Sequence, residues 1–135
     1  MYLCVCLDQK NGMMFNSRRQ SRDRVVIEDL INLSQGKLIM NTYSSSLFKD
    51  RESCIKITEE PLDITQDNEV CFIENIKVAP AIDKIDKIIV YRWDKSYPAD
   101  QYFDCDLNQW ELQSAVELTG YSHDKITKEI YGRRK

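Results

Sequence analysis

The sequence predicts an α/β protein with a single domain, built on a mixed, mostly parallel sheet with an antiparallel C-terminal edge and short flanking helices. Strand and helix patterns alternate through the first part of the chain, which is typical of parallel strands joined by helical crossovers. The last third instead carries three strand patterns in succession, which favours antiparallel pairing at one edge. The 135 residues suffice for one hydrophobic core, so residues 1–135 are predicted to form one domain.

The first third of the chain predicts a buried strand, a loop and a helix. Residues 2–8 are nearly all apolar, as expected of an interior strand covered on both faces, and the strand ends at the Asn11-Gly12 turn. A polar loop over 16–22 leads to a helix, with Ser21 as its expected N-cap and Gly36 as its stop. The apolar face of this helix comprises Val26, Ile27, Leu30, Ile31 and Leu33.

The rest of the chain predicts short strands with brief connections. A serine-rich turn at 42–46 leads to one helical turn, the acidic segment 59–68 reads as a loop, and the connector after Pro80 becomes helical. The expected strands are 37–40, 54–58, 70–73, 87–93, 110–118 and 125–131. The expected core includes Val5, Leu7, Leu30, Leu38, Met40, Phe72, Ile88 and Val90.

Composition narrows the class of protein. The net charge of −3 argues against nucleic acid as a partner, and no apolar run approaches the ~20 residues of a membrane helix. The five cysteines form no metal-ligand spacing, and no metal site is predicted. An odd number of cysteines, without a signal peptide, favours the reducing cytoplasm.

Several segments, in common order and spacing, resemble dihydrofolate reductase. Val5–Met13 is similar to that family's opening strand and turn, and Lys37–Met40 resembles the strand before its nucleotide-binding segment. Ala99–Phe103 followed by Trp110 is similar to its Gly-Asp-Thr-x-Phe…Trp stretch, and Ser122–Tyr131 is like its closing strand. The resemblance covers nearly the whole chain and implies a dihydrofolate-reductase-like fold.

The segments that hold the nucleotide in that family differ here. Where the family has Gly-Arg-x-Thr, this chain has 41–44, so only Ser44 stands in for the threonine as a candidate ligand-binding residue. Where the family has a Gly-Gly pair, this chain has Ile73-Glu74-Asn75, whose carboxylate and bulk oppose a diphosphate. The loop between Phe48 and Cys54 is too short for the family's 2′-phosphate loop. The sequence therefore predicts no cofactor.

Asp23 is the candidate residue for a ring ligand. The family's substrate carboxylate lies at the start of the first helix, and Asp23 falls about one residue from that place, after a loop that lacks the family's proline and tryptophan. The alternative is a first-turn residue that interacts with the helix dipole. The neighbouring arginines are expected to keep Asp23 ionised, and Asp23→Asn is expected to change stability little.

Arginines form the densest basic cluster of the chain. Arg18, Arg19 and Arg22 are candidate contacts to an anion or acidic partner, because guanidinium groups bind carboxylates and phosphates through paired hydrogen bonds. The alternative is a solvated surface whose charge is balanced by Asp23, Glu28 and Asp29.

Three further features have a structural interpretation beside a functional one. His123 lies between Ser122 and Asp124, which suggests nucleophilic catalysis, but adjacent residues of a strand point to opposite faces and cannot form a triad. Cys4 and Cys6 share one face of a buried strand, which favours packing over redox chemistry. An aromatic group favours core packing over a stacking platform; it comprises Trp93, Tyr97, Tyr102, Phe103 and Trp110.

These observations predict a small cytoplasmic binding or interaction protein on a degenerate dihydrofolate-reductase-like fold. Its partner is expected to be a small molecule or an acidic protein, and its added strand edge would allow a homodimer. The alternative is an NADPH-dependent reductase of a pterin-like ring that uses Asp23. A nucleic-acid-binding module that uses the arginines is the third possibility, and no catalytic residue is assigned.

Overall fold

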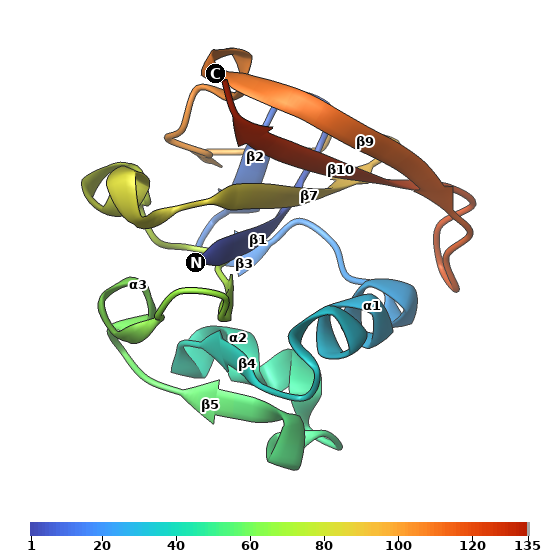
Figure 1. The fold of residues 1–135 in the computed structure, drawn as a ribbon. Helices are drawn as coiled ribbons and strands as arrows, with labels where there is room; N and C mark the ends of the chain where they lie inside the picture. Colours follow the sequence, from blue (N-terminus) through green and yellow to red (C-terminus); the bar gives the residue numbers. More distant parts are fainter. Residues whose placement is uncertain (135) are drawn as a thin grey trace.

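The computed structural model describes residues 1–134 and contains a seven-stranded sheet in the order β5-β4-β6-β1-β7-β10-β9 (Figure 1). The five strands from β5 to β7 run parallel, and β10 pairs antiparallel with both β7 and β9. The predicted fold class is therefore confirmed, including the antiparallel C-terminal edge. A second, three-stranded sheet has the order β3-β2-β8.

Each strand of the large sheet coincides with one of the predicted apolar or alternating runs. These strands are β1 (Tyr2–Leu7), β4 (Leu38–Met40), β5 (Ile55–Ile57), β6 (Val70–Phe72), β7 (Lys87–Trp93), β9 (Trp110–Leu118) and β10 (Ile126–Arg133). The small sheet consists of β2 (Gly12–Phe15), β3 (Arg18–Arg19) and β8 (Gln101–Tyr102). The helices are α1 (Arg24–Ser34), α2 (Thr42–Ser45) and α3 (Pro61–Ile64), with 3-10 turns η1 (Ser46–Phe48), η2 (Glu52–Cys54), η3 (Ala79–Lys84) and η4 (Leu107–Gln109).

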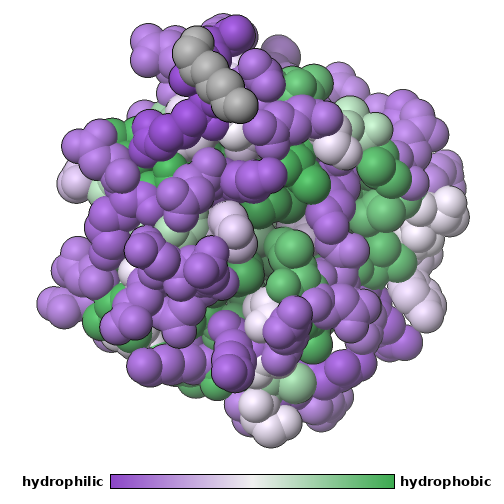
Figure 2. Space-filling view, viewed as in Figure 1, coloured by the Kyte–Doolittle hydropathy of each residue, from purple (hydrophilic) through white to green (hydrophobic). Residues whose placement is uncertain are grey.

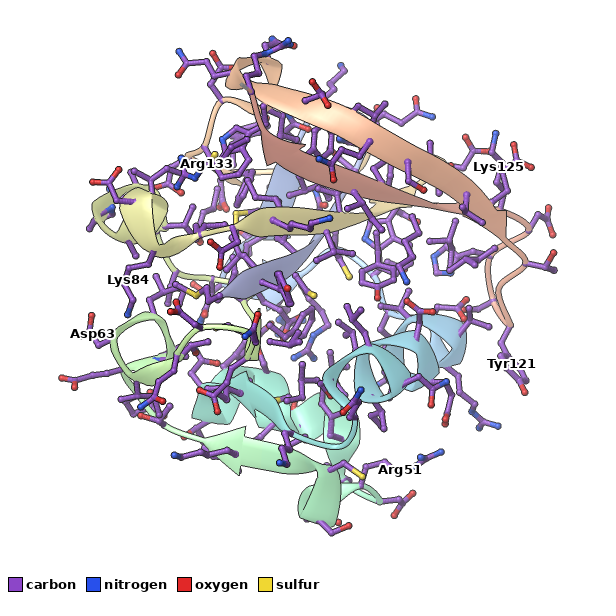
Figure 3. The ribbon with its side chains drawn as sticks, in the orientation of Figure 1. Arg51, Asp63, Lys84, Tyr121, Lys125 and Arg133 are labelled. Carbon is purple, nitrogen blue, oxygen red and sulfur yellow. The ribbon has the colours of Figure 1, made fainter. Side chains whose placement is uncertain are left out.

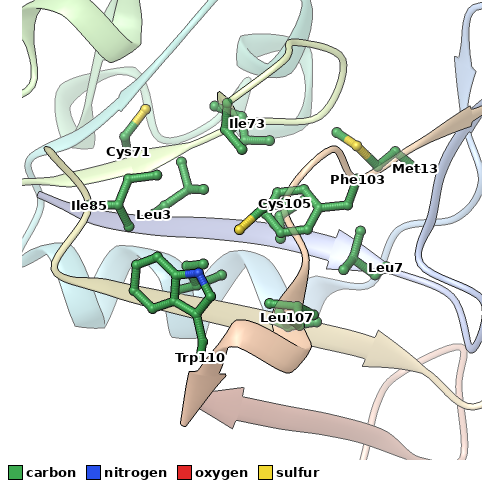
Figure 4. Packing of buried hydrophobic residues seen from close by; sticks show 14 of the residues in the cluster. Leu3, Leu7, Met13, Cys71, Ile73, Ile85, Phe103, Cys105, Leu107 and Trp110 are labelled. Atoms are coloured by element: carbon green, nitrogen blue, oxygen red, sulfur yellow. The ribbon is translucent and has the colours of Figure 1, made fainter. Parts of the chain in front are cut away.

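The large sheet separates two clusters of buried side chains. Successive residues of a strand point to opposite faces, so Leu3, Val5 and Leu7 of β1 join one cluster while Cys4 joins the other. Figure 4 shows the first cluster, in which Leu3 and Leu7 pack with Phe103, Cys105 and Leu107 from the segment before β9 and with Trp110 at the start of β9. The second cluster lies against α1, which contributes Val26, Leu30 and Ile31. All eight residues of the predicted core are buried.

Local structure differs from the sequence-based expectation at several places, which include the turn expected at 42–46, where α2 forms, and the strands β2 and β8, which were not expected. Helix α1 has Asp23 as its N-cap instead of Ser21, because the Asp23 carboxylate accepts the Val25 N–H at 2.9 Å. The predicted loop 16–22 contains β3, and the predicted loop 59–68 contains α3. Two-residue strands and one-turn helices depend on their tertiary partners, so a local pattern does not reveal them.

Helix α1 ends at the predicted place, but Gln35 is its C-cap and Gly36 follows. Gln35 and Gly36 both adopt positive φ angles, 55° and 76°, and the Gly36 N–H donates to the Ile31 carbonyl at 3.1 Å. Glycine adopts this conformation without a Cβ penalty, and the hydrogen bond satisfies a carbonyl of the last turn.

Hydrophilic residues cover most of the face seen in Figure 2, and hydrophobic residues show between them. The large apolar side chains that are exposed come from four strands and one loop, and two of them, Leu112 and Val116, share β9: they are Phe15, Ile57, Tyr102, Leu112, Val116 and Tyr121. Within residues 1–134, no helix has the length and apolar character needed to cross a membrane.

Because Phe72 is buried, its substitution tests the assigned core. Phe72 packs edge-on against Phe48, with ring centroids 6.2 Å apart. Phe72→Ala should lower the free energy of unfolding by ~3–5 kcal/mol, because it removes apolar contacts and leaves a cavity. Urea unfolding followed by tryptophan fluorescence measures this loss. Ile57→Ala, at an exposed position of β5, is the control and should change stability by no more than ~0.5 kcal/mol; equal losses would contradict the assigned core.

Candidate functional site at the start of helix α1

The Asp23 carboxylate is the centre of a hydrogen-bonded cluster at the start of α1. Its Oδ1 accepts the backbone N–H groups of Val25, at 2.9 Å, and Tyr121, at 3.0 Å. Its Oδ2 accepts the Ser122 N–H at 2.9 Å, the Ser122 hydroxyl at 3.2 Å and His123 Nδ1 at 2.8 Å. Asp23 is only 3% exposed. A carboxylate has about four lone-pair sites, so a ring ligand would have to displace these protein donors.

Apart from the Val25 N–H, these donors come from the β9–β10 loop, residues 119–125, which reaches down to the first turn of α1 (Figure 1). Gly120 makes this approach possible, since a Cβ atom there would lie 2.6 Å from Asp23 Oδ2. Figure 3 labels Tyr121 at the tip of this loop, where its ring lies beneath the guanidinium of Arg24 at 5.0 Å. The loop and the helix are thereby held together through one buried carboxylate.

His123 extends this cluster to a third segment. Its Nε2 lies 2.8 Å from the Ser21 hydroxyl, and its ring stacks on the buried Trp93 indole with centroids 4.5 Å apart. The side chain of His123 is 9% exposed. Ser21 and Asp23 therefore bind opposite nitrogens of one imidazole ring. The expectation that residues 122–124 lie on a strand is wrong, because they belong to the loop between β9 and β10. Ser122 Oγ lies 3.3 Å from His123 Nδ1, the nitrogen that also binds Asp23. The two nitrogens are instead bound by Ser21 and Asp23, about 100 positions away.

The hydrogen bonds keep Asp23 ionised. Burial alone would raise the pKa of its carboxyl, but the hydrogen bonds from His123 and from the N–H groups of Tyr121, Val25 and Ser122 outweigh burial and lower the pKa well below its usual range. The predicted direction is confirmed. The cause is this set of donors, and not the neighbouring arginines on which the prediction was based.

Arg19 and Glu74 form a paired contact at the place where the resemblance expects a Gly-Gly pair. Arg19 Nε lies 2.8 Å from Glu74 Oε2, and Arg19 Nη2 lies 3.1 Å from Oε1. The guanidinium also lies over the Tyr43 ring at 4.6 Å, and Glu74 is 7% exposed. Of the three predicted arginine contacts, Arg18 and Arg22 are exposed, while the Arg19 guanidinium is bound within the protein.

The start of α2 is likewise occupied by the chain's own acceptors. Asn41 caps the helix by accepting the Ser44 N–H at 3.1 Å, and its amide donates to Asn75 at 2.9 Å. The Glu59 carboxylate accepts from both the backbone N–H and the hydroxyl of Thr42, which lowers its pKa. The Ser44 hydroxyl is fully buried and finds no acceptor or donor among the described residues. These residues do not fit a dinucleotide diphosphate, because the carboxylates of Glu59 and Glu74 lie at the two segments that the resemblance assigns to nucleotide binding.

A cleft of about 550 Å³ lies at the segment that precedes Ser21 in the chain. Its wall includes Phe15, Arg18, Gln20 and Tyr97. The Gln20 amide donates to Asp8 Oδ2 at 3.1 Å, which leaves its buried Oε1 without a partner among residues 1–134. A buried acceptor of this kind is normally satisfied by a water, an ion or a ligand.

The other candidate residues take structural positions. Burial raises the pKa values of the Cys4 and Cys6 thiols, which keeps them protonated and unreactive. Trp93 packs in one core cluster, whereas Phe103 and Trp110 pack in the other, so they form no common platform. Within residues 1–134, no three His, Cys, Asp or Glu side chains gather as metal ligands.

The structure is similar to dihydrofolate reductase from Enterococcus faecalis, which was solved in complex with NADP(H) and RAB-propyl. The two structures agree with a TM-score of 0.65 at 11% sequence identity, over 99% of this chain and 96% of that chain. The chain has a dihydrofolate-reductase-like fold. No protein-family model matches the sequence, and no curated protein does. At this identity the likeness establishes the fold, and the site must be judged from its own residues.

The hydrogen bonds of Asp23 change the expected effect of its substitution. Asp23→Asn should lower the free energy of unfolding by ~1–3 kcal/mol, because its amide group would face N–H donors that now bind a carboxylate oxygen. Thermal and urea unfolding at neutral pH measure the change. Asp124→Asn, an exposed neighbour on the same loop, should change stability by no more than ~0.5 kcal/mol. If Asp23→Asn had an equally small effect, the assigned hydrogen bonds would be wrong.

The same variant should alter the pH dependence of stability. The pKa of Asp23 is lower in the folded than in the unfolded chain, so its contribution is complete above the unfolded value of ~3.9 and is lost as the pH falls below it. Unfolding measured from pH 6 to pH 2 should show a shallower loss for Asp23→Asn than for the wild type.

Proposed function

We propose that this chain is a small binding protein on a dihydrofolate-reductase-like fold, with a ligand that is an anion or an acidic segment of a partner protein. The cleft beside Arg18 and Gln20 is its binding site. Reduction with NADPH is not part of this function. The observation that carries the proposal is the Arg19–Glu74 pair, which occupies the region of the expected nucleotide contacts.

The buried Glu74 carboxylate opposes a bound diphosphate by charge. Its ion pair with Arg19 neutralises it internally, and breaking such a buried pair typically costs ~3–5 kcal/mol. A diphosphate that recruited Arg19 would leave Glu74 buried and unpaired. Glu59 adds a second negative charge at the N-terminus of α2. Both features favour a ligand other than a dinucleotide.

The cleft offers complementary groups to a small anion. Arg18 is exposed at its wall, so its guanidinium is available for paired hydrogen bonds to a carboxylate or phosphate. The unpartnered Gln20 Oε1 can accept a hydrogen bond from the same ligand. Phe15 and Tyr97 add aromatic surface. The groups favour an anion that also carries an N–H or O–H donor.

NADPH is expected to leave the protein's melting temperature unchanged. The measurement is thermal unfolding with increasing NADPH, with the Enterococcus faecalis dihydrofolate reductase as the positive control. Ligand at 100 times its dissociation constant would add about 2.7 kcal/mol of stability. A stabilisation of that size would contradict the proposal and favour the reductase alternative.

Binding of anions should depend on Arg18 and its exposed neighbour Arg22. Titration calorimetry with tripolyphosphate and with a poly-glutamate peptide should show binding that Arg18→Ala with Arg22→Ala weakens about tenfold, or ~1.4 kcal/mol. The matched control, Lys49→Ala with Lys56→Ala, removes two exposed charges elsewhere. Arg19 is unsuitable for this test, because its removal would leave Glu74 without its partner. Equal weakening by both double variants would show that binding follows net charge and not this cleft.

A further inference from the structure

Ser21, His123 and Asp23 form a continuous chain of hydrogen bonds. The Ser21 hydroxyl lies 2.8 Å from His123 Nε2, and His123 Nδ1 lies 2.8 Å from Asp23 Oδ2. A serine, an imidazole and a carboxylate in this order activate the serine hydroxyl as a nucleophile in enzymes of unrelated folds, which are recognised by geometry and not by sequence position. The arrangement is therefore able to support covalent chemistry at Ser21.

The ionised state of Asp23 determines where the protons lie in the series of hydrogen bonds from Ser21 to Asp23. An ionised carboxylate only accepts hydrogen bonds, so His123 Nδ1 carries the proton that Asp23 Oδ2 accepts. In the neutral ring Nε2 then has a free electron pair, and the Ser21 hydroxyl donates to it. This is the tautomer in which the imidazole can take the serine proton.

Three contacts hold the imidazole ring in place before any substrate arrives. Trp93 stacks on it with an interplanar angle of 22°, and Asp23 and Ser21 bind its two nitrogens. Asp23 is itself fixed by three backbone N–H groups. Ser21 is itself half-buried. Preorganised groups of this kind need no rearrangement at the moment of reaction.

We propose that Ser21 is the nucleophile of an ester-hydrolysing site, with His123 as its general base and Asp23 as the residue that orients the imidazole. The substrates are carboxylic esters that carry a negative charge. The exposed guanidinium groups of Arg18, Arg22 and Arg24 flank Ser21 in the chain. The preceding residue, Gln20, lines the 550 Å³ cleft together with Arg18, and the charged part of the ester is proposed to bind there.

The reaction needs only the ester and water. Ser21 Oγ attacks the carbonyl carbon while its proton passes to His123 Nε2. The bond to the leaving oxygen then breaks, and that oxygen takes the proton from Nε2 and departs as an alcohol. Water attacks the acyl-serine, its proton passes through Nε2 to Ser21 Oγ, and a carboxylic acid is released.

Covalent labelling tests this site directly. The protein is treated with a fluorophosphonate probe, which reacts with activated serines by loss of fluoride, and the labelled residue is located by peptide mass spectrometry. Wild-type protein should be labelled at Ser21 and should hydrolyse p-nitrophenyl succinate, an anionic ester. Ser21→Ala and His123→Ala should each lower the hydrolysis rate by at least ~100-fold. Ser53→Ala, at an exposed serine on η2, should leave both readings unchanged.

The two main variants separate chemistry from folding. Ser21→Ala keeps the hydrogen bonds of Asp23 and should retain the wild-type melting profile within a few degrees; if His123→Ala fails to fold, the Ser21 readings alone decide. Absence of label at Ser21, or hydrolysis that survives Ser21→Ala, would overturn the proposal. Tripolyphosphate binding by Ser21→Ala is measured in parallel, because Arg18 and Arg22 remain in that variant. Binding without labelling in the wild type would therefore reject the hydrolytic site and leave the proposed anion binding intact.

Discussion

The buried carboxylate of Asp23 is the constraint on which the arrangement of α1 and the antiparallel edge depends. An ionised group at 3% exposure is stable only when donors surround it. Helix α1 provides the Val25 N–H, and the β9–β10 loop provides the remaining donors. The loop must therefore descend to the helix, which fixes the end of β9 and the start of β10 relative to α1. A second contact, Lys128 to Asp29 at 2.8 Å, joins the same two elements further along.

The short segment before α1 is tied to the body of the protein by three buried acids. Arg19 pairs with Glu74, Gln20 donates to Asp8, and Ser21 reaches Asp23 through His123. Asp8 also accepts the N–H groups of Lys10, Gly12 and Tyr97, at 2.8, 2.8 and 2.9 Å. Three consecutive side chains are thus held by three different buried carboxylates. A loop held in this way has the rigidity that precise binding needs.

Much of the fold could be predicted from the sequence because it is encoded in short-range patterns. Residues 2–8 and 87–93 are apolar runs that hardly allow another interpretation, and both became central parallel strands. The start of α1 could not be assigned in the same way. Ser21 and Asp23 are both good N-cap residues, and the donors that favour Asp23 lie about 100 positions away.

Only some residues of the candidate site could be predicted from the sequence. Asp23 was selected from the resemblance and does lie at the start of the first helix, yet its carboxylate is saturated by protein donors. His123 was considered only with its neighbours Ser122 and Asp124, because a single sequence shows no long-range pairing. One feature of the sequence could have drawn attention to this site. His123, the only histidine of the chain, lies between Ser122 and Asp124, three residues after Gly120. Local context therefore identified the groups but not their partners.

The position of β9 has a consequence for the behaviour of the protein in concentrated solution. This nine-residue strand is the last of the sheet, and its neighbour is β10. Among residues 1–134, no strand lies beside its outer N–H and C=O groups. Leu112 and Val116, both about half exposed, lie on it with Glu111 and Glu117 close by. Charged residues on an edge strand discourage unwanted joining of sheets between molecules. Colloidal stability should therefore decline in acid, when these glutamates are neutralised, and added salt should weaken the same protection by screening.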